Sequence, residues 1–154
     1  MRRLEPRFLK RELVLLAGAF ASTLACGAGP SAVNPMNEEP LEPEVAFPLS
    51  AAAAEPDHVE LRFAIRDGYY LYSNRFRIEV EGLAAGPARI PEGIEKHDAF
   101  VGKSRVLRGD VRLVLPLARP PSRGDYPIRV TAQGCAEQRV CYAPFTQVVR
   151  VRYP

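Results

Sequence analysis

Apolar and polar residues alternate through most of the chain from residue 58 onward, and this pattern limits the fold more than any other feature. Every second residue between Val59 and Ile65 is apolar, and the positions between them are mostly charged. Four later segments repeat this period of two: 76–81, 111–115, 128–130 and 149–153. Such a period places one face of an extended strand in a core and the other in water. Turns rich in glycine and proline separate the segments, at 67–68, 81–82, 108–110 and 120–125.

The spacing of these strands predicts the fold class. No stretch of ten or more residues combines a helical period with helix caps, and the sequence has no internal repeat. Short strands separated by frequent turns are typical of an all-β fold, here an immunoglobulin-like antiparallel β-sandwich. We expect this domain to span residues 57–154, a length that suffices for one small core.

The first 25 residues are typical of an export signal. A basic head precedes an apolar run, Leu13–Ala25, which is shorter than the roughly 20 residues of a membrane-spanning helix. A small residue before Cys26 and a glycine-rich stretch after it resemble the processing site of bacterial lipoproteins, although Thr23 stands where leucine is usual. We expect Cys26 to be the lipid-bearing first residue of the mature chain. An ordinary cleaved signal with an incidental cysteine is the alternative.

The segment between this signal and the domain has a different composition. Residues 27–56 contain six prolines among small and acidic residues, which predicts an extended linker. The formal charge of +3 lies entirely in the leader, and sixteen basic and sixteen acidic residues follow it. Because nucleic-acid binding requires a basic surface, we expect no nucleic-acid partner.

Two cysteines near the C-terminus, Cys135 and Cys141, are separated by five residues. In an exported chain, thiols this close are bonded to each other or exchange bonds with a partner. The short ring contributes little stability, which favours a bond that opens and closes. The pair follows one predicted strand and precedes another, so we expect it exposed at a hairpin end. Arg139 would favour the Cys141 thiolate if it folded back, and a structural hairpin disulfide is the alternative.

Three motifs together resemble one family, the N-terminal periplasmic domain of the thiol:disulfide interchange protein DsbD. They are the aromatic run 67–72, the loop 98–103 and the segment 133–144 with both cysteines, within a resemblance over roughly residues 44–153. The resemblance implies an immunoglobulin-like domain on the periplasmic side of a bacterial envelope. A membrane thiol–disulfide electron donor would reduce this domain. The domain would then reduce thioredoxin-like periplasmic proteins, namely disulfide isomerases or proteins of cytochrome c maturation.

The resemblance also implies roles for individual residues. Cys141 matches the cysteine that forms mixed disulfides with partners, and Cys135 matches the cysteine that resolves them. Four residues match positions around the pair: the cap Phe100, the acidic Asp98, and the flanking Tyr70 and Tyr72. The implied activity is protein-disulfide-reductase-like interchange by a monomer, without a cofactor or a metal ion.

Ordinary packing offers alternative roles for the aromatic residues. Tyr69 points away from the face that Tyr70 and Tyr72 share, and at least one of the three is expected in the core. Phe100 without the resemblance would be a loop residue anchored in the core. These alternatives concern the residues around the cysteines rather than the cysteines themselves.

Two departures from the family pattern are visible. Ala99 stands where the family commonly has a second acidic residue. Neither membrane-spanning helices nor a Cys-x-x-Cys motif follow in the sequence, so we expect a free-standing version of the domain whose donor is another polypeptide. Two other functions are alternatives. One is a non-catalytic exported sandwich that binds a protein partner and has a purely structural disulfide, and the other is a copper or zinc site that combines His97 with the cysteines.

Overall fold

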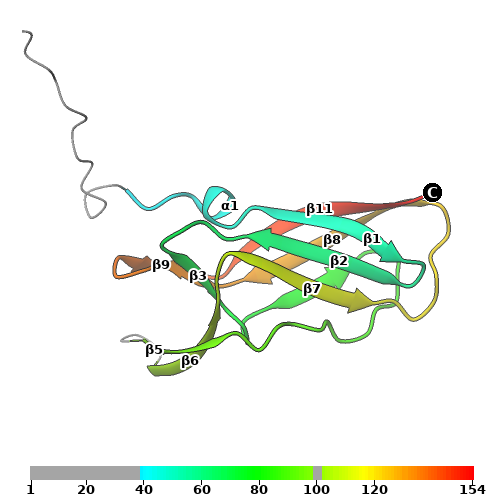
Figure 1. The fold of residues 1–154 in the computed structure, drawn as a ribbon. Coiled ribbons are helices and arrows are strands. Elements are labelled where there is room, and N and C mark those ends of the chain that lie inside the picture. The colour runs from blue at the N-terminus through cyan, green and yellow to red at the C-terminus, as the bar shows by residue number, and fades with distance from the viewer. Residues whose placement is uncertain (1–38, 99–101) are drawn as a thin grey trace, which may run out of the picture. The chain divides into compact units, whose positions relative to one another are not determined.

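The computed structural model describes residues 39–98 and 102–154, and strands dominate this range (Figure 1). One short helix, α1 (Pro43–Ala46), precedes them. The strands are β1 (Leu49–Glu55), β2 (His58–Ala64), β3 (Tyr69–Tyr72), β4 (Arg77–Val80), β5 (Ile94–Asp98), β6 (Gly102–Leu107), β7 (Asp110–Pro116), β8 (Gly124–Ala132), β9 (Gly134–Ala136), β10 (Val140–Cys141) and β11 (Phe145–Tyr153). None of the helical structure within the described residues is long or apolar enough to cross a lipid bilayer.

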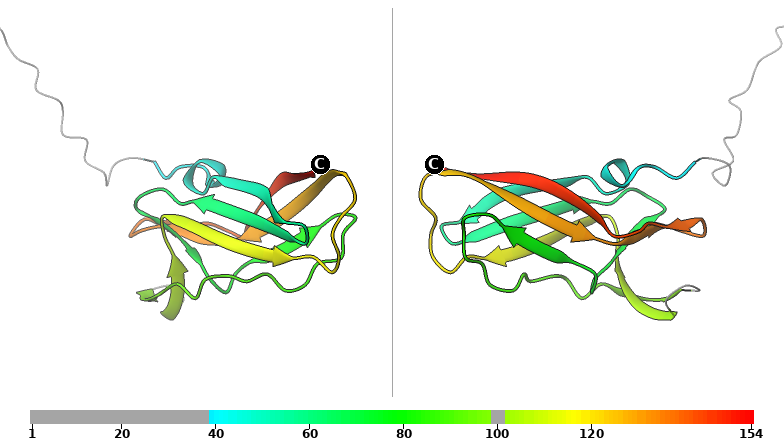
Figure 2. Two further views of the ribbon diagram at one scale, coloured as in Figure 1. Left: turned by 45° about the vertical axis from the view of Figure 1, so that its right-hand side comes forward. Right: turned by 180° about the vertical axis from the view of Figure 1, so that it is seen from behind.

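Two three-stranded antiparallel sheets form a sandwich (Figure 2). One has the order β1-β2-β7 and the other the order β11-β8-β4. The register places Leu61 of β2 opposite Leu113 of β7, and Ile128 of β8 opposite Val149 of β11. The predicted all-β, immunoglobulin-like antiparallel sandwich is therefore confirmed.

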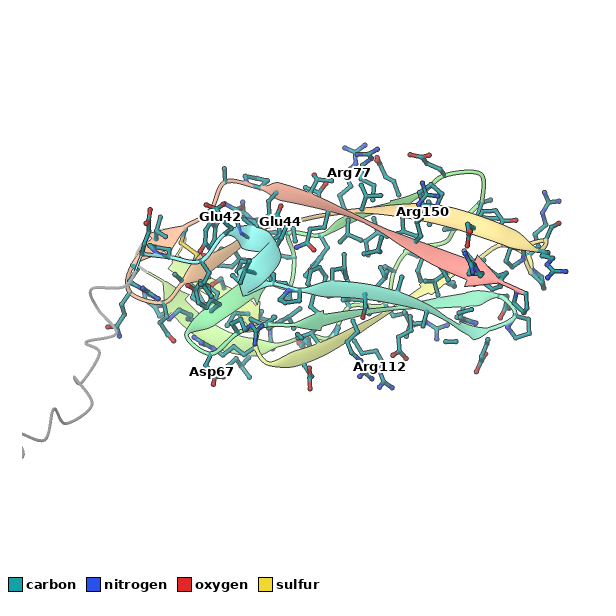
Figure 3. All side chains as sticks on the ribbon, turned by 90° about the horizontal axis from the view of Figure 1, so that it is seen from above. Glu42, Glu44, Asp67, Arg77, Arg112 and Arg150 are labelled. Carbon is teal, nitrogen blue, oxygen red and sulfur yellow. A yellow bond between two sulfur atoms is a disulfide. The ribbon has the colours of Figure 1, made fainter. Side chains whose placement is uncertain are left out.

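The core of the sandwich comes from the apolar positions of the alternating segments. Leu61, Leu113 and Ile128 are fully buried, and residues of both sheets belong to one apolar cluster. Charged residues at the intervening positions stand outside, as Figure 3 shows for Arg77, Arg112 and Arg150. The period of two in the sequence thus specifies which face of each strand is buried.

A five-stranded sheet with the order β10-β9-β3-β6-β5 continues from one end of the sandwich (Figure 1). Its ladders are short: β3 pairs with β9 at three positions and with β6 at two. β5 and β6 pair with each other over five positions, so their hairpin extends beyond the end of β3. This sheet carries both cysteines.

The expected linker through residue 56 is wrong for its last part. Residues 49–55 form β1, which pairs with β2, and Phe47 is fully buried. Proline interrupts a strand because it lacks an N–H, but Pro48 and Pro56 flank β1 without entering it. Small alanines can pair at the edge of a sheet without alternating with polar residues, so the alternation pattern did not predict this strand.

Candidate functional site

The two cysteines lie directly opposite each other in the β9–β10 hairpin and form a disulfide bond, with their Cα atoms 4.0 Å apart. The Tyr142 N–H donates to the Gly134 carbonyl oxygen at 2.9 Å, so the neighbouring positions are the hydrogen-bonded pair. The cysteines therefore occupy a non-hydrogen-bonded pair, where opposing side chains come closest. The register of the hairpin brings the two sulfur atoms together.

The two sulfur atoms differ in exposure. Cys141 is half-buried and belongs to β10, the edge strand of its sheet. Cys135 is 1% exposed, because β9 lies between β10 and β3. The expectation that the pair is exposed at the rim therefore fails for Cys135, because the tyrosines of β3 cover it.

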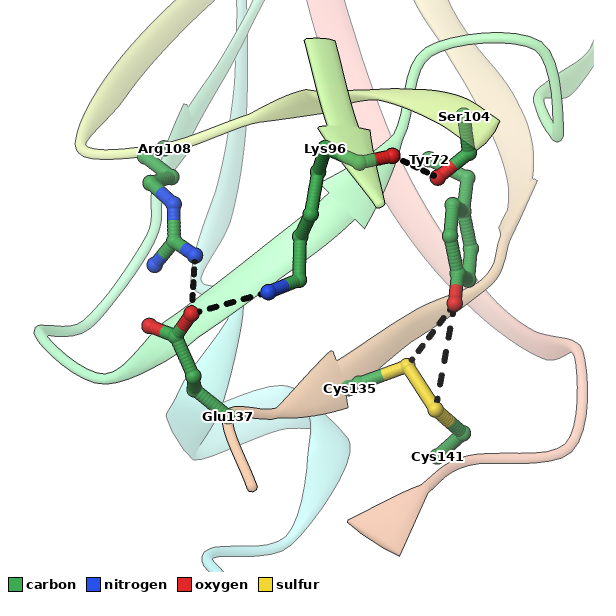
Figure 4. Close-up of polar contacts among 7 residues, drawn as sticks. All are labelled: Tyr72, Lys96, Ser104, Arg108, Cys135, Glu137 and Cys141. Atoms are coloured by element: carbon green, nitrogen blue, oxygen red, sulfur yellow. Dashed lines mark hydrogen bonds and ion pairs between the residues drawn. A yellow bond between two sulfur atoms is a disulfide. The ribbon is translucent and has the colours of Figure 1, made fainter. Parts of the chain in front are cut away.

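Tyr70 and Tyr72 of β3 form one buried cluster with Cys135, and Cys141 packs against it. Figure 4 shows the Tyr72 hydroxyl directed at the two sulfur atoms. Tyr70 is the cross-strand partner of Cys135, and its ring meets the Tyr72 ring edge-on at 5.6 Å. The Tyr72 hydroxyl lies 3.3 Å from Cys135 Sγ and 3.9 Å from Cys141 Sγ. It donates to these sulfur atoms, since a disulfide has no proton to give. As expected, Tyr69 points to the other face and belongs to the main core.

A charged cluster lies beside Tyr70. Glu137, in the turn between β9 and β10, accepts hydrogen bonds from Lys96 Nζ at 3.0 Å and from Arg108 Nη2 at 2.8 Å. These two hydrogen bonds, that of Arg108 first, lower the pKa of Glu137 below its usual value. Lys96 and Arg108 also lie over the Tyr70 ring, 5.2 Å and 5.1 Å from its centroid. Sequence analysis missed these three residues, which no local motif connects.

The backbone before Cys135 requires glycine. A methyl group on Gly134 would lie 2.8 Å from Leu71 Cδ2 and 2.9 Å from Phe47 Cζ, and closer still to the Tyr70 carbonyl oxygen. Phe47 reaches this point because its ring packs edge-on against Tyr69. The segment that was expected to be a linker is therefore packed beneath the cysteine-bearing strand.

Two tyrosine hydroxyls bind the backbone of the same N-terminal segment. Tyr142 donates to the Leu41 carbonyl oxygen at 2.6 Å, and the Leu41 N–H donates to the Tyr69 hydroxyl at 2.9 Å. Burial is the main cause that raises the pKa of Tyr142 to about 12. These hydrogen bonds connect residue 41 to Tyr142, which directly follows Cys141, and to Tyr69 of β3.

The structure describes the remaining candidate residues only in part. The Arg139 guanidinium lies over the Tyr69 ring, 6.0 Å from its centroid. Asp98 ends β5 opposite Gly102, and its side chain lies outside the described structure. Phe100 and Cys26 also lie outside the described residues.

Metal-ligand spacing occurs elsewhere in the described part of the chain. Glu55, Asp57 and His58 place ligand atoms within 4.8 Å of one another. This group contains neither His97 nor a cysteine, so it gives no support to the copper or zinc alternative.

Comparison with known proteins places this fold and disulfide in a family. The family described as "Thiol:disulfide interchange protein DsbD, N-terminal" matches residues 37–152. The chain belongs to this family. It is 38% identical over 109 residues to thiol:disulfide interchange protein DsbD 1 of Pseudomonas aeruginosa, covering 70% of this chain and 18% of the relative. Against DsbD of Escherichia coli K12 the identity is 37% over 91 residues, covering 59% and 16%. The chain thus spans less than a fifth of these relatives.

Solved structures of DsbD N-terminal domains resemble this chain. The Neisseria meningitidis DsbD N-terminal domain in the reduced form superposes with a TM-score of 0.65 at 32% identity, covering 73% of this chain and 90% of that one. A structure of the complex between the DsbD N-terminal and PilB N-terminal domains of the same organism gives a TM-score of 0.61 at 32% identity, covering 73% and 88%. Both agree with the immunoglobulin-like DsbD N-terminal fold.

Proposed function

We propose that this DsbD N-terminal-type domain relays reducing equivalents on the periplasmic side of the envelope through the Cys135–Cys141 disulfide. The observation that carries the proposal is the asymmetry of the pair. Cys141 lies half-buried on an edge strand, whereas Cys135 is buried beneath Tyr70 and Tyr72. An exchange centre needs one sulfur atom that partners can reach and a second that resolves the mixed disulfide.

The geometry supports a specific order of steps. A thiolate of the electron donor attacks Cys141 Sγ, the Cys135–Cys141 bond breaks, and Cys135 leaves as a thiolate. The donor's second thiolate then attacks its own sulfur atom in the mixed disulfide and releases Cys141. The domain has gained two electrons and, after protonation, two protons. In the second half of the relay, the Cys141 thiolate attacks the disulfide of the acceptor, and one sulfur atom of the acceptor leaves as a thiolate. The Cys135 thiolate then attacks Cys141 Sγ, which forms the Cys135–Cys141 bond and releases the second sulfur atom of the acceptor as a thiolate.

Tyr72 supports the leaving group in this scheme. Its hydroxyl is within reach of both sulfur atoms. A thiolate accepts such a hydrogen bond more strongly than a neutral disulfide does, because bonds to an ionised acceptor are charge-assisted. Tyr72 therefore favours the state in which the disulfide is open.

The partners are proposed from the family. The DsbD N-terminal domain of Neisseria meningitidis has been solved in a complex with the PilB N-terminal domain. We assign to the present domain a membrane thiol–disulfide donor and thioredoxin-like periplasmic acceptors, including proteins of cytochrome c maturation, with the domain acting as a monomer. The relatives are much longer than this chain, so the donor can be another polypeptide or another part of the same one.

A trapping experiment tests the function and the roles of the two cysteines. A Cys135→Ala variant should accumulate mixed disulfides with a thioredoxin-like partner, and a Cys141→Ala variant should not. In the wild type, alkylation followed by mass spectrometry should detect both thiols only after treatment with reduced thioredoxin. A disulfide that resists thioredoxin throughout would identify the bond as structural and the domain as a non-catalytic binding module.

Two further assignments rest on the sequence alone. Phe100 is proposed as a cap over the cysteines with Asp98 near the thiols, and Phe100→Ala should raise the rate of thiol alkylation while the free energy of unfolding changes little.

Cys26 is proposed to carry lipid after removal of a signal peptide. Membrane fractionation should release Cys26→Ser as soluble protein but retain the wild type, and equal release of both would contradict lipidation.

A further inference from the structure

The carboxylate of Glu137 joins the turn of the cysteine hairpin to two other segments of the chain (Figure 4). Glu137 Oε1 binds Lys96 of β5 and Arg108, which follows β6. The Glu137 N–H also donates to the Gly68 carbonyl oxygen at 2.7 Å, just before β3. The turn of the cysteine hairpin is therefore fixed to neighbouring elements by both its side chain and its backbone.

This arrangement differs from an ordinary surface ion pair. The side chains of Lys96, Glu137 and Arg108 are 23%, 33% and 31% exposed, whereas those of Arg77 and Glu79 on β4 are 77% and 49% exposed. Half-buried ion pairs are screened less by solvent and salt than exposed ones. The pKa of Glu137 is lowered by its two partners, so the carboxylate stays charged at neutral and mildly acidic pH.

A continuous set of contacts leads from Glu137 to the sulfur atoms. Lys96 and Arg108 lie over the ring of Tyr70. Tyr70 is the cross-strand partner of Cys135 and meets Tyr72 edge-on, and the Tyr72 hydroxyl reaches both sulfur atoms. The hairpin itself has little pairing of its own, with two ladder positions between β9 and β10 and three between β9 and β3. Because so few ladder pairs hold the hairpin, the Glu137 contacts at its turn contribute strongly to fixing the position of Cys135.

We propose that Glu137 is a positioning residue that keeps Cys135 against Cys141 while a mixed disulfide is resolved. The proposal rests on the proposed exchange function. In the step concerned, the Cys135 thiolate attacks Cys141 Sγ, the Cys135–Cys141 bond forms, and the partner's sulfur atom leaves as a thiolate with the electron pair of the broken bond. The equilibrium and the rate of this step depend on the effective concentration of Cys135 at Cys141. Once the disulfide is open, the short ladder and the Glu137 contacts maintain that concentration.

Glutathione serves as the probe, because it separates the two steps of disulfide formation. The first equilibrium forms the mixed disulfide between glutathione and Cys141, and the second forms the Cys135–Cys141 bond and releases glutathione. Mass spectrometry of acid-quenched mixtures gives both constants. We expect Glu137→Gln and Lys96→Met to lower the second constant about threefold to tenfold, the range for loss of a charge-assisted, partly buried contact. The first constant should not change.

A double variant and a matched control locate the effect. Lys96→Met/Glu137→Gln should lower the second constant by less than the product of the two single effects, because the two residues share one contact. Glu79→Gln removes a carboxylate from an ion pair on β4 and should leave both constants at the wild-type values. The proposal would be overturned if the double variant showed the full product of the two single effects, or if Glu79→Gln lowered the second constant as much as Glu137→Gln does.

Charge and position must be separated, because the loss of the carboxylate leaves two cations near the cysteines. The pH profile of Cys141 alkylation in the reduced variants reports the thiol directly. The positioning role is supported if the constant for Cys135–Cys141 bond formation falls while the pH profile of Cys141 alkylation stays the same. It is overturned if a shift of that pH profile accounts for the whole fall in the constant. If the wild-type pair does not equilibrate with glutathione or with reduced thioredoxin, the proposed function itself fails. If it does and the variants match it, only the role of Glu137 is wrong.

Discussion

The sandwich and the cysteine-bearing end of this domain are stabilised by different kinds of contact. In the sandwich, long ladders such as β2–β7 and β8–β11 bury apolar side chains in a continuous core. At the cysteine-bearing end, the ladders that join β10, β9, β3 and β6 have only two or three positions, and tyrosine hydroxyls, ion pairs and a disulfide connect the strands. Apolar burial is nondirectional, whereas these polar contacts depend on position to within tenths of an ångström.

This difference implies that stability and reactivity are controlled in separate places. The sandwich contains most of the large, fully buried apolar side chains, so apolar burial stabilises the fold chiefly there. The cysteine-bearing end determines which sulfur atom is reachable and what contacts it. Substitutions in the sandwich should reduce stability and leave the thiols unchanged, and substitutions around the disulfide should do the reverse.

The largest expected effect is in the sandwich core. Leu113 is fully buried between the sheets, so Leu113→Ala should lower the free energy of unfolding by about 2–5 kcal/mol. Arg112→Ala, on the exposed face of the same strand, should cost less than about 1 kcal/mol. Urea unfolding measures both, and the alkylation rate of the folded, reduced protein should match the wild type. A faster alkylation in Leu113→Ala below the unfolding transition would contradict the separation.

The next effect is at the junction of the two regions. Gly134→Ala forces a methyl group against Leu71, Phe47 and the backbone of Tyr70, and should lower the free energy of unfolding by about 1–3 kcal/mol. Because residue 134 precedes Cys135, the second glutathione constant should fall as well. Gly124→Ala is the matched control, since its methyl group would lie at an ordinary 3.6 Å from the Tyr126 ring. Equal stability of the two variants would show that the hairpin shifts freely.

The same contrast explains what the sequence could predict. The alternation of β2, β4, β7, β8 and β11 was visible because each strand has one apolar face. β1 was missed because alanines between prolines show no alternation, and β5 and β6 because most of their residues are polar. The pairing of the cysteines and the tyrosines beside them followed from local spacing and the family motifs. Glu137 could not be found in this way, because its partners lie 41 and 29 residues away along the chain.

A smaller effect is expected where the N-terminal segment meets the cysteine-bearing end. Tyr142→Phe removes the hydrogen bond to the Leu41 carbonyl oxygen and should cost about 1 kcal/mol at pH 7. The pKa of Tyr142 is raised to about 12 in the folded protein, above the value near 10 of an unfolded chain. Stability from this group is therefore complete below pH 10 and is lost as the pH rises toward 12.

The pH dependence distinguishes Tyr142 from the other tyrosines. The stability difference between the wild type and Tyr142→Phe should shrink as the pH rises from about 10 toward 12. Burial also raises the pKa of Tyr153, but Tyr153 is present in both proteins and cancels in the difference. Chemical unfolding at a series of pH values gives the curve. A difference that stays constant through this range would show that the Tyr142 hydroxyl does not titrate in contact with Leu41.

The smallest effect on stability should accompany a clear effect on the thiols. Tyr72→Phe keeps the ring and removes the hydroxyl that contacts both sulfur atoms, so the free energy of unfolding of the oxidised protein should change by less than about 1 kcal/mol. In the reduced variant, a cysteine thiolate no longer accepts a charge-assisted hydrogen bond from Tyr72. The thiolate is then less favoured over the thiol, which should slow alkylation at pH 7 about threefold to tenfold. Tyr126→Phe is the matched control and should leave alkylation unchanged, because it removes a hydroxyl that donates to the Ser122 carbonyl oxygen in the loop before β8. A large loss of stability with unaltered alkylation would make Tyr72 a packing residue like those of the sandwich, and the contrast between the two regions would then not extend to β3.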